Sequence, residues 1–220
     1  GQIRYTIVQI DGESKIIFVH IPRTGGSWFS YAWNSAKGIG PCVLQGNKLV
    51  NRSNNKSVEC GKHGRLSGIL DKLEKIEYDH AGHKIVTMVR HPVDRALSSW
   101  VWFSEVKDTA KKHGWKSIDD MLDEFEGGNH RSNYMPQVFW LEEQNAKFDH
   151  IYKFEDVLSN NKIVQKDFPL FNRGYANKNH LRRGRKKTGN EYFDQKQIER
   201  IKHLYRDDIN FLSEHYKDLK

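Results

Sequence analysis

Residues 20–28 (HIPRTGGSW) follow an apolar, β-rich run and combine the residue types that bind anions. The two glycines allow backbone N–H groups to turn toward a ligand, while Thr24 and Ser27 add hydroxyl donors and Arg23 adds a fixed positive charge. The spacing differs from the G-x-x-x-x-G-K-[ST] loop of ATP-binding proteins, so a nucleotide kinase loses its main support. The segment therefore predicts an anion-binding loop between a strand and a helix, with an ordinary glycine-containing turn as the alternative.

A second motif occupies residues 89–100 (VRHPVDRALSSW) and also follows a run typical of a buried strand. Arg90 stands at the end of that run, and Ser98 lies two helical turns further on. The start of a helix favours bound anions, so this segment predicts a second anion site. We interpret His20 and His91, which lie inside the two motifs, as local supports rather than as catalytic bases.

The two motifs together resemble those of sulfotransferases that use 3′-phosphoadenosine 5′-phosphosulfate (PAPS). In the similar carbohydrate sulfotransferases the first loop reads H-I-P-K-T-G-G-[TS] and the second reads R-[DH]-P-x-x-R-x-x-S. The resemblance covers residues 15–100 directly and extends loosely to the basic loop after residue 172. It implies an α/β fold like that of the P-loop NTPases, in three layers, with a central, mostly parallel sheet flanked by helices. It also implies an O-sulfotransferase that moves a sulfuryl group to an acceptor hydroxyl, expected on a carbohydrate, and releases 3′-phosphoadenosine 5′-phosphate (PAP) without a metal.

The resemblance also assigns roles to residues of the two motifs. Arg90 and Ser98 would hold the 3′-phosphate of the donor. Arg23 stands where the family usually has Lys, and because a guanidinium keeps its proton at working pH, we expect charge stabilisation of the leaving group from it rather than proton donation. The 5′-phosphosulfate would be held by Arg23, Thr24, Gly25, Gly26, Ser27 and Trp28.

Transfer to a hydroxyl also needs a group that accepts the proton of the acceptor. Related enzymes place this base between the two motifs, shortly before a helix, which indicates His63 in residues 60–66 (CGKHGRL). An imidazole, with a reference pKa of about 6.5, suits neutral pH. His80, His83 and the carboxylate of Glu59 are the alternatives that the sequence leaves open.

The two cysteines, Cys42 and Cys60, border a polar stretch with N-glycosylation sequons at Asn51 and Asn55. In a secretory protein this pattern would indicate a disulfide-closed, glycosylated loop. In a cytosolic protein it would indicate reduced thiols, the interpretation that we favour slightly. We therefore expect a soluble protein of the cytoplasm, or of the Golgi lumen if an N-terminal anchor has been trimmed. A zinc site of Cys42, Cys60, His63 and His80 is disfavoured, because the sequence has no close C-x-x-C pair.

The net charge of +8 is concentrated in one segment, residues 173–187, which has seven basic and no acidic residues. Without it, 29 basic residues would face 28 acidic ones. Such a run can be a solvated surface or a nucleic-acid-binding patch, and nucleic-acid binding is the alternative function. In the resembling enzymes a basic loop before the last helix covers the donor, and no nucleic-acid partner is expected. That placement indicates Arg182, Arg183 and Arg185 as donor-binding residues.

The elements that must position these residues can be read from hydrophobic periodicity. The 220 residues, 37% hydrophobic and 29% charged, suit one sulfotransferase domain over 1–220, and no apolar run is long enough to span a bilayer. Strands that alternate with helices predict a parallel sheet covered on both faces. Residues 40–62 are expected to form a polar, turn-rich insertion. We predict strands over 3–10, 16–21, 84–89 and 148–154, and helices over 25–36, 65–77, 92–101, 117–126, 134–144 and 155–158, with one long helix from 194 to 216.

Overall fold

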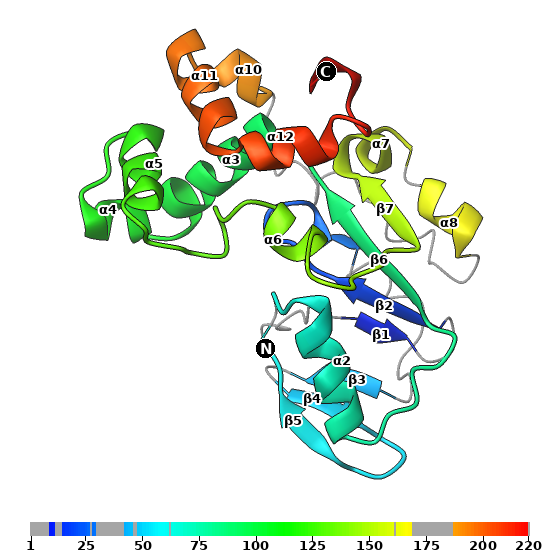
Figure 1. Ribbon diagram of the computed structural model, residues 1–220. Coiled ribbons are helices and arrows are strands. Elements are labelled where there is room, and N and C mark those ends of the chain that lie inside the picture. Colours follow the sequence, from blue (N-terminus) through cyan, green and yellow to red (C-terminus); the bar gives the residue numbers. More distant parts are fainter. Residues whose placement is uncertain are drawn as a thin grey trace. The chain divides into compact units, whose positions relative to one another are not determined.

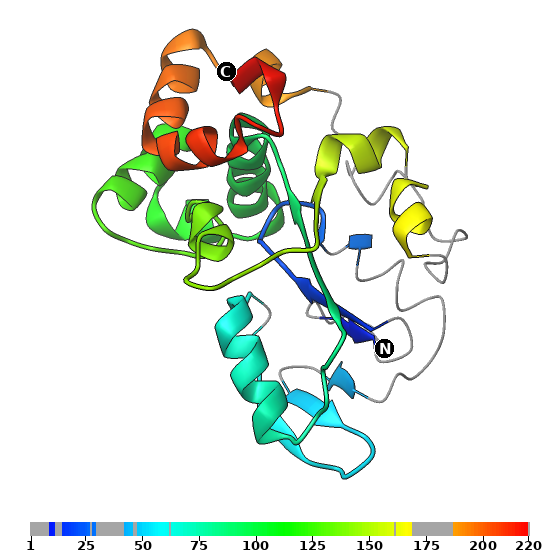
Figure 2. The same cartoon turned by 45° about the vertical axis from the view of Figure 1, so that its right-hand side comes forward.

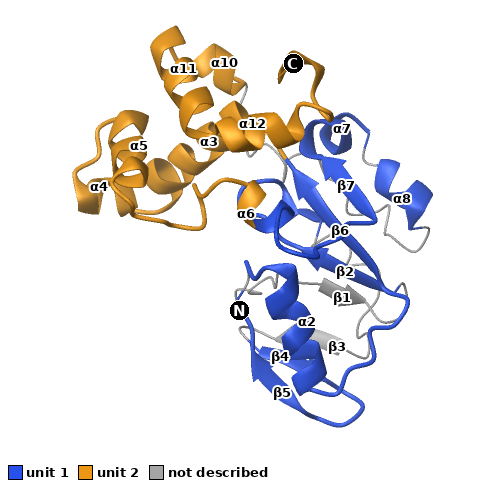
Figure 3. Cartoon of the chain, in the orientation of Figure 1, with its two compact units in different colours: residues 1–89, 140–183 blue, residues 90–139, 184–220 orange. Residues whose placement is uncertain are grey.

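The chain contains two compact units, each built from two separate stretches of sequence (Figure 3). Residues 1–89 and 140–183 form unit 1, and residues 90–139 and 184–220 form unit 2. The computed structural model describes residues 9–11, 15–26, 28–29, 42–45, 48–61, 63–160, 162–168 and 187–219 (Figure 1).

Unit 1 is organised around a mainly parallel sheet (Figures 1 and 2). Its strands, in the order β1-β2-β6-β7, are β1 (Gln9–Asp11), β2 (Ile16–Val19), β6 (Lys84–Val89) and β7 (His150–Lys153). β1 pairs with β2 in antiparallel fashion, whereas β2, β6 and β7 run parallel to one another. The apolar sequence of β6, KIVTMV, suits this central position, because a strand with neighbours on both sides in a covered sheet has little contact with water.

Helices α7 (Phe154–Ser159) and α8 (Ile163–Asp167) follow β7 and complete the core of this sheet. The buried side chains of the core come from β2, the loop after it, β6, β7 and these two helices, and include Phe18, Phe29, Met88, Phe154, Val157 and Val164. Because parallel strands alternate with helices here, the predicted α/β class, with a mostly parallel sheet flanked by helices, is confirmed.

Residues 40–62, predicted as a polar, turn-rich insertion, contain a second sheet in their described part. Strands β3 (Cys42–Gln45), β4 (Lys48–Asn51) and β5 (Ser57–Glu59) pair in antiparallel order, and α2 (Leu66–Lys75) follows them. The strands are only three or four residues long, too short for their alternation to stand out among the polar residues of the turns.

Asn51, the first glycosylation-type residue, is only 2% exposed. Its Nδ2 donates to the carbonyl oxygens of Ile76 (3.0 Å) and Glu77 (3.2 Å), which ties β4 to the end of α2. The amide that glycosylation would modify is therefore a buried structural donor in the folded protein. The Cys60 thiol is buried and free, and burial raises its pKa.

Unit 2 is helical in its described residues. Helix α3 (Pro92–Val101) continues into a π-helical turn (Trp102–Val106). Its apolar face packs with those of α5 (Ile118–Glu126) and α11 (Gln195–Leu204). The core includes Leu97, Phe103, Met121, Leu122 and Ile201. No helix among the described residues of the chain is both long enough and apolar enough to cross a membrane. The other helices are α4 (Thr109–His113), α5 (Ile118–Glu126), α6 (Val138–Leu141, at the boundary of the units), α10 (Gly189–Tyr192), α11 (Gln195–Leu204), α12 (Arg206–Leu212) and a 3-10 turn (Lys217–Leu219).

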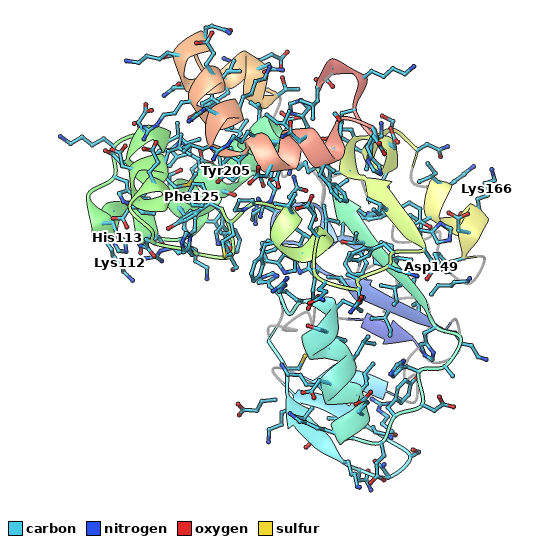
Figure 4. The ribbon with its side chains drawn as sticks, viewed as in Figure 1. Lys112, His113, Phe125, Asp149, Lys166 and Tyr205 are labelled. Atoms are coloured by element: carbon cyan, nitrogen blue, oxygen red, sulfur yellow. The ribbon has the colours of Figure 1, made fainter. Side chains whose placement is uncertain are left out.

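The single long helix predicted from residue 194 is wrong, because the chain leaves helical geometry at Tyr205 (φ −102°, ψ 28°). Tyr205 donates its hydroxyl hydrogen to the Tyr134 carbonyl, and its ring stacks on Phe125 with centroids 5.4 Å apart (Figure 4). These contacts fix the side chain where α11 ends and α12 begins. The helix predicted over 134–144 is also too long, since only Val138–Leu141 is helical there.

Candidate functional site

The two motifs follow neighbouring strands of the sheet in unit 1. β2 and β6 are parallel, with Val19 in register with Thr87, and the Thr87 hydroxyl donates to the Val19 carbonyl at 2.7 Å. The first motif begins immediately after β2, and Arg90 is the residue that follows β6. In α/β sheets the carboxyl ends of such strands are the usual place for ligands.

The backbone of the first loop has two residues with positive φ. Arg23 has φ 67° and Gly25 has φ 92°, with Thr24 between them. Alternation of left-handed and right-handed residues turns successive N–H groups toward one side, which is how backbone nests bind anions. Because Arg23 is not glycine, its positive φ stores strain, a property that is frequent at ligand-binding turns. The Gly25 carbonyl then accepts from the N–H groups of Trp28 (3.0 Å) and Phe29 (3.1 Å) as the next helix begins.

Both glycines of the loop are required by packing as well. A Cβ on Gly25 would lie 2.7 Å from Phe154 Cδ2 and 3.1 Å from the Met88 sulfur. A Cβ on Gly26 would lie 1.8 Å from Cδ2 of His20, so the imidazole of His20 occupies the place of a side chain there. His20 is therefore the support of the loop that the sequence predicted.

The other predicted residues of the first loop lie in different surroundings. Thr24 is fully buried and its hydroxyl donates to the Ile21 carbonyl at 2.8 Å, so this hydroxyl holds the turn. Trp28 packs into the core of the sheet. Arg23 is half-buried. Ser27 lies outside the described residues.

His63 lies directly beside the first motif. Its Nδ1 is 3.4 Å from the His20 carbonyl oxygen, and the two imidazole centroids are 4.7 Å apart. A carbonyl can only accept, so this contact requires the hydrogen on Nδ1 and leaves Nε2 as the basic nitrogen of the neutral ring. Trp140 donates its indole N–H to the His63 carbonyl at 2.9 Å, which holds the backbone of the same residue.

The alternative bases lie elsewhere. His80 and His83 precede Lys84, the first residue of β6, and therefore belong to the opposite end of that strand from Arg90. The Nε2 atom of His83 lies 3.0 Å from the Tyr78 hydroxyl, and burial lowers the pKa of this histidine. Glu59 is exposed at the end of β5 in the second sheet. Among the four candidates, the described structure brings His63 to the first motif.

In unit 2, His91 caps the helix that carries the second motif. Its Nδ1 accepts from the Val93 N–H at 3.3 Å, so the hydrogen resides on Nε2, which donates to Asp218 at 3.0 Å. His91 is therefore a local support, as predicted. Ser98 is buried within α3, and Arg90 is half-buried.

A protein-family comparison matches almost the whole chain. Residues 7–216 fit the model described as the sulfotransferase family. The chain belongs to the sulfotransferase family. No curated protein and no solved structure gave a match. Family membership makes the protein an enzyme that transfers a sulfuryl group from a sulfo donor to an acceptor. Within the described part of this sulfotransferase, no cluster of three or more His, Cys, Asp or Glu residues could hold a metal ion.

Arg95 of the second motif has a structural position that the sequence did not reveal. It is buried, and its guanidinium donates to the carbonyls of Met135 (2.6 Å) and Ser132 (3.4 Å). Burial lowers the pKa of Arg95 and raises that of Asp208, and the two opposite charges counteract both shifts. The resemblance in the motif included this arginine, but a buried and an exposed arginine look alike in sequence.

The predicted donor-binding residues Arg182, Arg183 and Arg185 lie outside the described residues. The described chain of the sulfotransferase resumes at Lys187, the last residue of the basic run. Two residues later, the Gly189 N–H donates to Asp94 of α3 at 2.6 Å. A Cβ on Gly189 would lie 2.8 Å from the Val93 carbonyl oxygen, so the chain after the basic run packs closely on the first turn of α3.

Proposed function

We propose that this sulfotransferase transfers the sulfuryl group of PAPS to a hydroxyl group of a carbohydrate. One observation carries the donor assignment: the two motifs that we predict to bind anions follow adjacent parallel strands, β2 and β6. PAPS has phosphate groups at the 3′ and 5′ positions of one ribose, and therefore requires two anion sites. The carbohydrate acceptor is proposed because both motifs resemble those of carbohydrate sulfotransferases.

On the donor side, the first loop, residues 23–28, binds the 5′-phosphosulfate through its backbone N–H groups up to residue 27 and through the Arg23 guanidinium, while Arg90 and Ser98 bind the 3′-phosphate. When the bond between sulfur and the bridging oxygen breaks, its electron pair goes to the phosphate of PAP. Arg23 stabilises this negative charge as a fixed cation with a planar array of donors. Arg182, Arg183 and Arg185 remain predicted contributors to donor binding.

On the acceptor side, the hydroxyl oxygen attacks sulfur in line with the leaving phosphate, and His63 accepts the proton released from that hydroxyl. The contact between His63 Nδ1 and the His20 carbonyl supports Nε2 as the accepting atom. The same contact restrains rotation of the ring, and Trp140 restrains the backbone of His63. Correct alignment matters because a positioned base contributes about 10²–10⁴-fold to the rate.

Two substitutions test these roles with PAP binding and turnover as separate measurements. Arg90→Ala should weaken PAP binding by about tenfold or more, because it removes charge-assisted hydrogen bonds to phosphate. His63→Ala should lower kcat by about 10²-fold or more with PAP binding nearly unchanged.

His80→Ala is the matched control for the base, since His80 belongs to the other end of β6. Turnover should be followed with radiolabelled PAPS and a panel of hydroxylated acceptors that includes neutral and acidic polysaccharides. Full activity of His63→Ala would place the base elsewhere, and transfer to non-carbohydrate acceptors alone would refute the acceptor assignment.

A further inference from the structure

In unit 2, the backbone of Arg90 is held by a single side chain from a distant part of the sequence. The Arg90 N–H donates to Gln137 Oε1 at 3.0 Å, and Gln137 Nε2 donates to the Arg90 carbonyl at 2.7 Å. Gln137 has 0% exposure. Two such bonds to the N–H and C=O of one residue are what a paired antiparallel strand would supply. The carboxamide therefore fixes the backbone of Arg90 at the point where β6 has ended.

Gln137 is itself held in place by buried charges. The N–H of the next residue, Val138, donates to Asp208 Oδ1 at 2.9 Å. On the preceding side, Arg95 donates to the carbonyl of Met135 at 2.6 Å. Both Asp208 and Arg95 are almost completely buried. Burial raises the pKa of Asp208, and the charge of Arg95 and hydrogen bonds from Gln137 and Val138 oppose this rise.

Two buried opposite charges are an expensive way to hold a segment. Taking two charges out of water costs several kcal/mol per ion, and apolar residues of similar size often give equal or greater stability. The pair differs from apolar packing in that it fixes directions, because each charge bonds specific backbone atoms of residues 132–138. That segment contains the residue whose side chain restrains Arg90.

We propose that Gln137 is a positioning residue for donor binding, which orients Arg90 toward the 3′-phosphate, and that the Arg95–Asp208 pair positions Gln137. This inference rests on the role of Arg90 in the proposed function. An arginine side chain has several rotatable bonds. To contact a phosphate through two hydrogen bonds, its Cα–Cβ bond must point in a defined direction. Fixing the N–H and C=O of Arg90 defines that direction before the donor binds, so less conformational entropy is lost on binding.

The test compares two nucleotides that differ in the 3′-phosphate alone. Calorimetry on the full chain gives the affinities of PAP and of adenosine 5′-monophosphate, and their ratio measures the preference for the 3′-phosphate. Gln137→Met keeps the length of the side chain but forms neither bond to Arg90. We expect the ratio to fall about tenfold, with the affinity for the monophosphate nearly unchanged.

Asn51→Leu is the matched control. Asn51 is also a buried amide that donates to backbone carbonyls, but it lies in β4 of unit 1. Its substitution removes comparable hydrogen bonds, so it should lower thermal stability and leave the nucleotide ratio at the wild-type value. A general loss of stability would not change that ratio, whereas a loss of positioning would.

Arg90→Ala and the double variant complete the experiment. If Gln137 acts through Arg90, the double variant has the same ratio as Arg90→Ala. A wild-type ratio in Gln137→Met, together with a reduced ratio in Arg90→Ala, overturns the inference and leaves the proposed function intact. Equal affinities of the wild-type protein for both nucleotides overturn the proposed function itself. If Gln137→Met does not fold, Gln137→Asn is judged by the same criterion, because it keeps the amide but draws it back by one methylene.

Discussion

At Gly26 the ring of His20 takes the space of a side chain. His20 thereby connects the first loop with His63, the candidate base. The imidazole of His20 packs against Gly26, and the backbone carbonyl of His20 accepts a hydrogen bond from Nδ1 of His63. His20 therefore contacts both Gly26 of its own loop and His63 of a separate segment. A glycine that the sequence explains by backbone freedom is required here by the ring that packs on it.

Gly26→Ala tests this contact at the residue scale. The new Cβ would lie 1.8 Å from the imidazole of His20, so the ring must move and the loop must distort. We expect a loss of about 1–3 kcal/mol in stability from overpacking, together with weaker PAP binding. Chemical denaturation and calorimetry measure the two effects.

Gly68→Ala provides the comparison, because this glycine lies in α2 and a Cβ there would meet no atom within 4 Å. It should stabilise the protein by about 0.5–1 kcal/mol, since alanine favours the helix, and leave PAP binding unchanged. Normal stability and PAP binding in Gly26→Ala would show that His20 does not restrain the loop.

At the element scale, the start of α5 shows how local sequence can determine a helix boundary. Ser117 accepts from the Asp119 N–H, and Asp120 accepts from the N–H groups of Lys116 and Ser117, which completes a capping box. These two backbone donors hold the pKa of Asp120 below its usual 3.8. A carboxylate with a depressed pKa in the folded state stabilises the protein above the unfolded pKa, and this contribution is lost as the pH falls through the folded value.

Asp120→Asn should therefore destabilise the protein at pH 7, with a difference from wild type that shrinks as the pH falls below 3.8. Thermal unfolding at several pH values measures this trend. Glu142→Gln, at an exposed position outside the capping box, should show no such trend. A difference of the same size at pH 7 and at pH 2–3 would contradict the role of the charge.

Elements with local signals were predictable, and those decided by distant contacts were not. The apolar run of β6 and the capping residues Ser117 and Asp194 mark their elements in the sequence itself. The end of α11 at Tyr205 depends instead on a hydrogen bond to the Tyr134 carbonyl, which no local pattern indicates. The short strands within residues 40–62 were missed because polar turns dominate that stretch.

The same division applies to the candidate site. Both motifs are contiguous, so the sequence revealed them, and His63 followed from the family resemblance. The contacts of Gln137 with Arg90 and of Asp208 with Val138 join segments far apart in the chain, and neither residue belongs to a motif. Side-chain support of this kind becomes visible only in the folded structure.

At the scale of the whole molecule, the two units have separate hydrophobic cores. Leu122 is fully buried in the core of unit 2, and Val157 is fully buried in the core of unit 1. Each core draws its side chains from both sequence stretches of its own unit, such as Val86 with Val157 in unit 1. A substitution that leaves a cavity in one core should therefore destabilise first the helices and strands that contribute to that core.

Leu122→Ala should cost about 2–5 kcal/mol, because it leaves a cavity among α3, α5 and α11. Hydrogen exchange should then accelerate in these helices more than in β2, β6 and β7. Val157→Ala should give the reverse pattern. Uniform acceleration throughout the chain in both variants would show that the two cores unfold as one.

The discontinuous make-up of the units has a consequence for biosynthesis. Residues 1–89 of unit 1 leave the ribosome before residues 140–183, which supply β7. In unit 2, α3 is synthesised well before α11 and α12, so its packing is completed only after they have been made. At about 5–20 residues per second, the delay between Arg95 and Asp208 is on the order of ten seconds. During that interval the nascent chain contains Arg95 without the opposite charge of Asp208, and during the first half of it the sheet also lacks β7. We expect both units to complete their cores only late in translation.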